Sequence, residues 1–362
     1  MKELSYYLSA AASLALAVSM SMSLTSCAKE DNPSGGGDVT PSGSPKVIFK
    51  EVNIGGGFKT IEGNKSYSWC KAITLYNNSN KAVTIKNLAM GAVPPGNAHA
   101  PSNHSYDESG KLKWAGADYT PIWATVWYIP EITIAPYSDA VIAVNGAIDH
   151  SAIATGAFDL SDASYYAMYD PESGMNNANA YPTPAAGIPA SHYWKGIMFG
   201  NGNAWAISVM CPAIILFQVP DSHNLADMTK AEEYFYYDGA EKQTQLCIKI
   251  PNAWILDGIE FYRIGYEADS KKRLDTTIDA GYGLYNSNKQ YSAYRNVDKA
   301  ATEAIAENSG KLVYNYDQAV EGTSEPSGID AAASIKKGAK IVYQDTNNSS
   351  ADFHVRKTWS LK

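Results

Sequence analysis

The sequence has few cysteines, and this limits how the chain can be cross-linked. Four occur in 362 residues, and one of them, Cys27, stands near the amino terminus. The other three are Cys70, Cys211 and Cys247, and three cysteines cannot all pair internally. Cys211 and Cys247 lie in apolar runs, which favours buried thiols. An oxidising exterior also permits one disulfide, so both arrangements remain open.

Positive charge is also scarce. The chain has 29 Lys and Arg against 37 Asp and Glu, a net charge of −8, and its basic clusters are short, at residues 271–273 and 336–337. A protein that binds nucleic acid needs a concentrated basic face to neutralise phosphates. The charge pattern therefore argues against a nucleic-acid partner.

Local signatures of catalysis are missing. The sequence contains no HExxH, GxSxG, P-loop, CxxC or EF-hand pattern. Among the six histidines only His99 and His104 lie close together, and a metal site there would need further ligands from elsewhere. We therefore expect no metal, no cofactor and no enzyme, although carboxylates dispersed along the chain would leave no local motif.

The amino terminus predicts where the protein works. Residues 10–18 form a small apolar run, which has the length of a signal-peptide core and is too short to span a bilayer. Residues 24–27, Leu-Thr-Ser-Cys, resemble the lipobox of bacterial lipoproteins. This resemblance implies that residues 1–26 are a signal peptide removed before Cys27, whose sulfur then carries lipid.

The segment after Cys27 predicts a tether. Residues 27–45 are rich in Gly, Ser, Pro and Asp, so they cannot bury enough apolar surface to offset the entropy of ordering. Such a linker holds the folded part roughly 20–25 Å from the lipid. Glu30 and Asp31 resemble the export signal of Bacteroides-type lipoproteins, so we expect an outer-membrane location facing the cell exterior.

From residue 46 onward the composition predicts an all-β fold with a few short helices. Tyrosine is abundant, turn-forming residues are spread throughout, and helical periodicity is scarce. Short helices are expected only at 227–233, with a capping box from Thr229 to Glu232, and at 298–307. Residues 73–85, ITLYNNSNKAVTI, predict a hairpin with a purely structural role. The expected strands are 46–52, 72–76, 82–85, 123–129, 140–144, 204–210, 214–219 and 254–262.

Several blocks resemble lamin-tail domains, in the order that family shows. The entry strand and ITLYNNSNKAVTI at 47–85 come first, followed by a corner at 134–142 and paired strands at 203–219. Leu-Asp-Gly-Ile-Glu at 256–260, Ser-Ala-Tyr-Arg at 292–295 and DTNNSSADF at 345–353 complete the series. The arrangement is most similar to an uncharacterised family of Bacteroides lipoproteins.

The resemblance implies one interrupted domain over residues 46–362. Its expected fold is an immunoglobulin-like β-sandwich with long loop insertions, a scaffold that fixes no activity by itself. The sequence departs from the family pattern at Thr74 and at 137–138, where Pro-Gly is common. Gly281-Tyr282-Gly283 starts like a phosphate-binding loop, but Asn286 replaces the third glycine and no helical pattern follows, so we interpret it as a turn.

Two long insertions, 91–121 and 150–195, are the candidate functional segments, because loops of that length in a compact domain are usually functional or disordered. Both carry aromatic residues that could stack on sugars or seat a protein partner. The alternative is that these rings pack in the core or cover the sheets. The candidate binding residues are Trp114, Tyr119, Tyr165, Tyr166, Tyr193 and Trp194.

Two functions from different classes follow. The first is a non-catalytic surface binding or accessory protein, held to the membrane by its lipid anchor, with an outer-membrane uptake transporter or a glycan as partner. The alternative is a surface hydrolase that uses dispersed carboxylates. Paired carboxylates about 5–10 Å apart in a cleft would favour the hydrolase.

Overall fold

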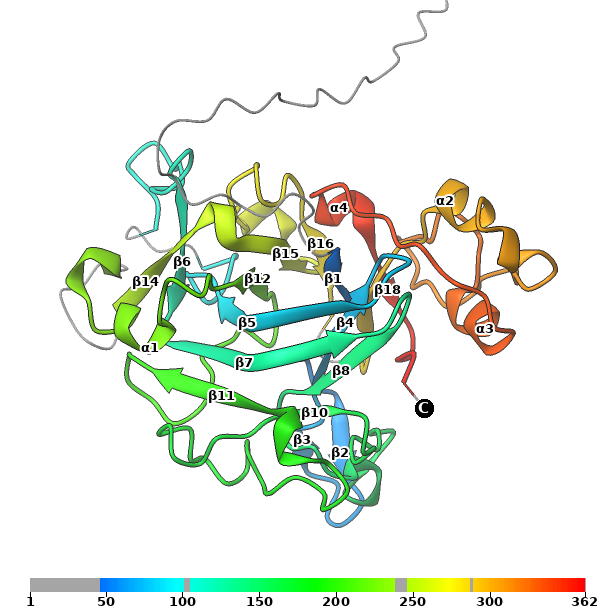
Figure 1. The fold of residues 1–362 in the computed structure, drawn as a ribbon, viewed down its shortest axis with the longest axis horizontal. Helices are drawn as coiled ribbons and strands as arrows, with labels where there is room; N and C mark the ends of the chain where they lie inside the picture. Colours follow the sequence, from blue (N-terminus) through cyan, green and yellow to red (C-terminus); the bar gives the residue numbers. More distant parts are fainter. Residues whose placement is uncertain (1–45, 101–104, 238–245, 287–288, 362) are drawn as a thin grey trace, which may run out of the picture. The chain divides into compact units, whose positions relative to one another are not determined.

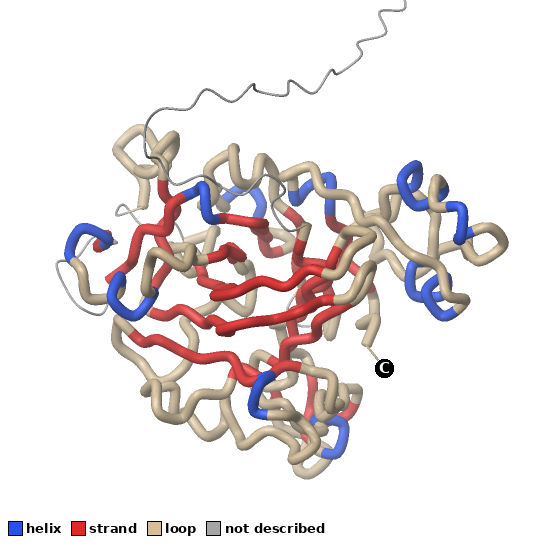
Figure 2. The backbone as a smooth tube through the Cα atoms, in the orientation of Figure 1, coloured by secondary structure: helices blue, strands red, loops and turns tan. Residues whose placement is uncertain are grey.

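The computed structural model describes residues 46–100, 105–237, 246–286 and 289–361. These residues fall in one of the two units into which the chain divides, Thr40–Lys362. Strands and loops dominate them, and the helices are short (Figures 1 and 2). The predicted signal peptide, Cys27 lipidation site and linker lie outside the described residues.

One mixed sheet of twelve strands organises the fold (Figure 1). Most neighbours are antiparallel, but β10 runs parallel to both of its neighbours and β16 runs parallel to β15. Across the sheet the strands are β16 (Gly283–Tyr285), β15 (Ile255–Arg263), β12 (Ala213–Gln218), β5 (Val83–Ala92), β7 (Thr125–Ile134), β11 (Tyr193–Met198), β10 (Tyr166–Met168), β8 (Asp139–Ala143), β4 (Ala72–Asn77), β1 (Val47–Asn53), β17 (Ser292–Arg295) and β18 (Phe353–Arg356).

The sheet curls until its two edges nearly meet. Edge strand β16 contacts β17 and the opposite edge strand β18, and β15 contacts β1. The expected immunoglobulin-like sandwich is therefore wrong: the strands form one nearly closed, barrel-like sheet. Strands with alternating apolar and polar residues occur in sandwiches and in barrel-like sheets alike. The two folds differ in which strands pair, and those pairings join residues far apart in sequence.

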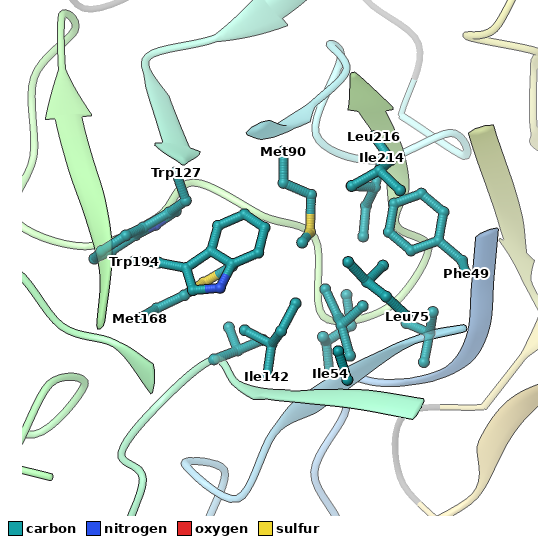
Figure 3. Close-up of a cluster of buried hydrophobic side chains, with 14 of the residues drawn as sticks. Phe49, Ile54, Leu75, Met90, Trp127, Ile142, Met168, Trp194, Ile214 and Leu216 are labelled. Atoms are coloured by element: carbon teal, nitrogen blue, oxygen red, sulfur yellow. The ribbon is translucent and has the colours of Figure 1, made fainter. Parts of the chain in front are cut away.

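The core fills the inside of this sheet (Figure 3). Phe49, Leu75, Met90 and Ile214 are fully buried and come from four different strands. Inward-facing apolar residues alternate with outward ones along most strands, as the period of two requires. A second cluster, around Ile122, Ile215 and Phe217, packs outside the sheet, so β12 is covered on both faces.

The stretch at 73–85 forms two strands but no hairpin. Strand β4 pairs with β1 and β8, whereas β5 pairs with β12 and β7. The predicted hairpin is therefore wrong, although the turn chemistry is present. Asn77 fixes the corner, because its Nδ2 donates to the carbonyl oxygens of Lys81 at 2.7 Å and Ile134 at 3.0 Å.

Six further strands form two small sheets beside the main one. One contains β13 (Phe235–Tyr237), β14 (Leu246–Pro251) and β6 (Tyr119–Trp123); the other contains β3 (Ser66–Tyr67), β2 (Phe58–Thr60) and β9 (Ala154–Thr155). The expected strand at 123–129 is split, because β6 ends at Trp123 and β7 begins at Thr125. The expected strand at 204–210 does not form.

The helices are short and begin with side-chain caps. They are α1 (Leu225–Met228), α2 (Lys299–Glu303), α3 (Ala331–Lys336) and α4 (Ser349–Asp352), with 3-10 turns at His150–Ala152, Ala190–His192, Glu232–Tyr234, Asn252–Trp254, Glu267–Asp269 and Ala306–Asn308. Their N-cap residues are Asn224, Asp298, Asp330 and Asn348, whose side-chain oxygens accept from backbone N–H groups. The expected helix at 298–307 is confirmed as α2 and the following turn. The expected capping box at Thr229 is wrong, because Thr229 ends α1.

Within the described ranges, each helix is too short or too polar to cross a lipid bilayer.

Candidate functional site

The two tryptophans among the predicted binding residues lie in the interior. Trp114 is fully buried, and its Nε1 donates to the carbonyl oxygen of Arg273 at 3.0 Å. Trp194, on β11, is also fully buried and packs in the main core (Figure 3). Tyr119 on β6 is half-buried, with Lys249 Nζ 5.5 Å from its ring centre. The two tryptophans thus present no ring face at the surface.

The three remaining tyrosines lie on or directly before β10 and β11, which are neighbours in the sheet. They face opposite sides of it: Tyr166 packs against the main core, whereas Tyr165 and Tyr193 pack against a cluster on the other face. The ring of Tyr166 stacks on His192, with centroids 4.3 Å apart and planes at 22°. Tyr193 meets Tyr169 edge-on at 5.5 Å, and the carbonyl oxygen of Tyr165 lies 3.0 Å from His192 Nδ1. All five side chains are half-buried. We call this group the aromatic patch, and its binding role stays a prediction.

A pocket that the sequence did not reveal lies where the edges of the sheet approach each other. We call it the seam pocket. Its volume is about 500 Å³, within the range of small-ligand sites. It is lined by Glu267, Tyr282, Gly283, Leu284, Asn296, Gly322, Thr323, Ser324, Pro326, Ser350, Ala351 and Phe353. Most of these residues belong to β16, β18, α4 and the loop at 322–326, while Glu267 starts a 3-10 turn, Tyr282 directly precedes β16 and Asn296 directly follows β17.

The first wall of the seam pocket brings together two stretches that are far apart in sequence, the G-x-G at 281–283 and the segment around Ser350. Tyr282 N donates to Ser350 Oγ at 2.9 Å, and Ser350 Oγ donates back to Tyr282 O at 2.9 Å. Close approach depends on Gly281, because a Cβ there would collide with Asn348 Oδ1 and lie 2.8 Å from Ser350 N. At Gly283 a Cβ would lie 2.5 Å from the ring of Phe261. Gly281 therefore allows α4 to pack against the start of β16, and Gly283 allows β16 to pack against Phe261 of β15.

Tyr282 supplies an aromatic ring to this wall. Its ring stacks on the buried Tyr262, with centroids 3.9 Å apart and planes at 11°. Tyr262 thus covers one face of Tyr282, which leaves the other face or the edge to line the pocket. Burial raises the pKa of Tyr262, with Glu260 adding to the effect. A ring fixed in this way can contact the C–H face of a ligand at little entropic cost.

The floor is set by a chain of hydrogen bonds through Asn296. Its Nδ2 donates to Ala351 O at 2.7 Å, so its Oδ1 accepts from His354 Nδ1 at 2.7 Å. With Nδ1 protonated, His354 Nε2 accepts from the hydroxyl of Tyr316 at 2.6 Å. Burial, reinforced by Arg356, lowers the pKa of His354 to about 3, so the ring is neutral. The chain holds the Asn296 amide in one orientation.

The opposite wall is the loop at 322–326, which is anchored at two points. Thr323 Oγ1 donates to Val320 O at 2.9 Å. The carboxylate of Glu325 accepts from Val297 N and from Ser327 N, both at 2.9 Å. Burial raises the pKa of Glu325, and these hydrogen bonds oppose the rise. The loop is thereby tied to the chain directly after β17.

Charges near the pocket are mostly compensated behind its walls. Glu260 is fully buried and meets Arg273 Nε at 3.0 Å and Lys272 Nζ at 2.7 Å. Lys272 Nζ also lies 3.7 Å from Asp279, whose Oδ2 accepts from Ser349 Oγ. Glu267 is the carboxylate in the described lining. Beside this one carboxylate, the pocket presents hydroxyls, an amide, backbone and the aromatic rings of Tyr282 and Phe353, a surface suited to a hydrogen-bonding ligand without a charge of its own.

Metal centres and reactive thiols are two further kinds of chemical site. In the part of the chain that the structure describes, no cluster of three His, Cys, Asp or Glu residues could hold a metal ion. His99 Nδ1 lies 3.5 Å from Cys211 Sγ, and His104 lies outside the described residues. Cys70 and Cys211 are free thiols, and both are buried, as is Cys247. The expectation of burial is confirmed at both positions where apolar runs predicted it, Cys211 and Cys247.

The fold and pocket together define a β-rich protein with a polar pocket at the nearly closed edge of one large sheet. The family model described as "Protein of unknown function (DUF4876)" matches residues 135–317. The chain therefore belongs to the DUF4876 family. A search of curated proteins finds no match.

A solved structure shares the fold. It is the crystal structure of a DUF4876 family protein from Bacteroides thetaiotaomicron VPI-5482, with 20% sequence identity and a TM-score of 0.56. The match covers 86% of this chain and 70% of that chain. The predicted likeness to an uncharacterised Bacteroides family is confirmed at this coarser level, whereas the comparisons give no support to the lamin-tail assignment.

Proposed function

We propose that this protein is a lipid-anchored surface binding protein whose ligand site is the seam pocket. The ligand class is a neutral polyhydroxylated molecule, such as a sugar unit of a glycan. One observation carries the proposal: the pocket combines the Tyr282 ring with the amide of Asn296 and hydroxyls from Thr323, Ser324 and Ser350. Sugars present apolar C–H faces and many hydroxyls, and such a lining complements both.

Binding fits this lining better than cleavage does. Glycoside hydrolysis uses two carboxyl groups that flank the scissile bond. Among the described residues that line the seam pocket, Glu267 supplies one carboxyl group where hydrolysis needs two. A release assay for reducing ends, run on every sugar that binds, tests the hydrolase alternative directly.

The experiment that tests the proposal measures binding of the purified protein to an array of monosaccharides and oligosaccharides. We expect Tyr282→Ala to weaken binding at least tenfold, because it removes the ring that stacks on Tyr262 and lines the seam pocket. Tyr166→Ala, in the aromatic patch, is the matched control and should bind like the wild type. Loss in Tyr166→Ala with normal binding in Tyr282→Ala would move the site to the patch, and no binding by the wild type would overturn the proposal.

The membrane part of the proposal rests on the lipobox-like sequence at 24–27 and the Gly/Ser-rich segment after it. Cys27→Ser should move the protein from the membrane fraction to the soluble fraction. Crosslinking on intact cells, followed by purification from solubilised outer membrane, then tests for a transporter partner. Recovery of a transporter in comparable amount supports an uptake accessory, and recovery of the protein alone favours independent glycan binding.

A further inference from the structure

A second pocket adjoins the seam pocket. We call it the distal pocket; its volume is about 420 Å³. It is lined by Val297, Asp298, Lys299, Ala300, Pro326, Ser327, Gln344 and Thr346. Pro326 lines both pockets, and Asn296 in the seam pocket is followed in sequence by Val297 in the distal one. The two cavities are therefore neighbours with Pro326 between them.

The same two segments wall both pockets. Residues 322–327 form one side, and residues 344–353 form the other, with 296–297 between them. Backbone hydrogen bonds hold this arrangement: Gln344 N donates to Asn296 O at 2.8 Å, and Asn296 N donates to Asp352 O at 2.7 Å. The pockets thus follow one another along a single groove.

The distal pocket has the same chemical character as the seam pocket. Gln344 and Ser327 add an amide and a hydroxyl, and Pro326 adds an apolar ring. The two charged residues are engaged locally: Asp298 Oδ1 accepts from Ala301 N at 2.9 Å, and Lys299 Nζ lies 4.0 Å from Glu303. The groove therefore continues as a surface for neutral hydroxyl-bearing units.

We infer that the groove binds a linear oligosaccharide, with one sugar unit in the seam pocket and a following unit across Pro326 in the distal pocket. This inference rests on the proposed function and adds the chain length of the ligand. A ligand with one unit occupies the seam pocket alone. A ligand with two or more units gains contacts with the Gln344 side of the groove.

The test compares calorimetric affinities for one-, two-, three- and four-unit members of the sugar series that the array identifies. We expect at least a tenfold gain in affinity beyond one unit. Ala300→Trp, at an exposed position in the distal pocket, should abolish that gain and leave the single-unit affinity unchanged. Ala351→Trp, at an exposed position in the seam pocket, should weaken binding of every length.

Ala304→Trp is the matched control, because Ala304 is exposed and lines neither pocket. Gln344→Ala is a second distal variant, should Ala300→Trp lower the thermal stability, and it should reduce the length gain. Equal affinity for one unit and for longer chains, with no effect of either distal variant, overturns the groove but leaves a single-sugar site standing. No binding of any length overturns the proposed function itself.

Discussion

Asp257 on β15 and Arg295 on β17 form a buried ion pair between strands that do not pair with each other. Arg295 Nη2 lies 2.5 Å from Asp257 Oδ2, which also accepts from Phe49 N on β1 at 2.7 Å. Arg295 Nε in turn donates to Phe49 O at 2.6 Å. The backbone groups of Phe49 thus find side-chain partners where strand pairing is interrupted. Three strands are linked across the nearly closed side of the sheet.

Removing this link should destabilise the protein strongly. Arg295→Met leaves Asp257 and Asp352 buried without the guanidinium that they face at 2.5 and 3.6 Å. Breaking such a pair costs about 3–5 kcal/mol of unfolding free energy, measured by urea denaturation. Lys340→Met breaks an exposed pair with Glu307 and should leave stability unchanged within error. A similarly small change for Arg295→Met would contradict the role of the link in closure.

His354 should make a contribution to stability that is lost as the pH drops below about 6.5. The carboxyl groups of Asp257, Asp279 and Glu325, whose pKa values burial raises, contribute in the opposite direction, so the part due to His354 is read from a variant. The pKa of His354 in the folded protein, about 3, lies below the ordinary value of 6.5. Between these two pH values the imidazole is therefore protonated in the unfolded chain and neutral in the folded chain. The groups packed around it are Tyr294, Tyr316, Asn296 and Arg356. Proton uptake by the unfolded chain lowers the free energy of unfolding by up to about 1.4 kcal/mol per pH unit.

The measurement for His354 is chemical denaturation over a pH series. His354→Gln should show a shallower loss of stability between pH about 6.5 and about 3, because the titrating group is gone. Identical slopes in the variant and the wild type would show that His354 does not carry this dependence.

Gly281→Ala should disturb the first wall of the seam pocket. The added Cβ meets Asn348 Oδ1 and lies 2.8 Å from Ser350 N, so α4 must move away from β16. Overpacking of this kind costs about 1–3 kcal/mol. Gly187→Ala is the control, since the nearest atom to its Cβ would be 3.8 Å away. A change in melting temperature as small as that of the control would show that α4 moves away from β16 without a loss of stability.

The thiol of Cys70 should be inert in the folded protein. Burial raises its pKa to about 12, which the hydrogen bond with Phe158 only partly opposes. At neutral pH we expect iodoacetamide to label Cys70 at least ~100-fold more slowly in the folded protein than in concentrated urea. Peptide mass spectrometry resolves this site from the other cysteines. Equal rates under the two conditions would mean that the thiol is reached without unfolding.

Local sequence patterns predicted many strands well. Ala72–Asn77, Asp139–Ala143 and Ile255–Arg263 lie within a residue or two of the expected ranges, because alternating β-branched and aromatic residues favour strands wherever they pair. The partners could not be predicted in this way. The corner at Asn77 has hairpin chemistry, yet β4 and β5 each pair elsewhere, since a turn signal fixes a chain reversal but not the neighbour in the sheet.

The seam pocket could not be predicted from the sequence, for the same reason. Two of its components, the G-x-G at 281–283 and the segment 345–353, were both noted in the sequence, but nothing local indicates that they lie against each other. The aromatic count drew attention instead to Trp114 and Trp194, whose rings turn out to fill the interior. Aromatic residues are frequent in both cores and binding sites, so their number alone does not separate the two.

The pairing of β1 with β17 has a consequence for biosynthesis. Glu51 pairs with Tyr294, so residues made early in translation wait for partners made late. Folds with such distant pairings form slowly, because a large loop must close before the contacts are gained. A chain that emerges amino terminus first therefore carries the unpaired edge of β1 until the last strands arrive, and during that interval it is open to aggregation.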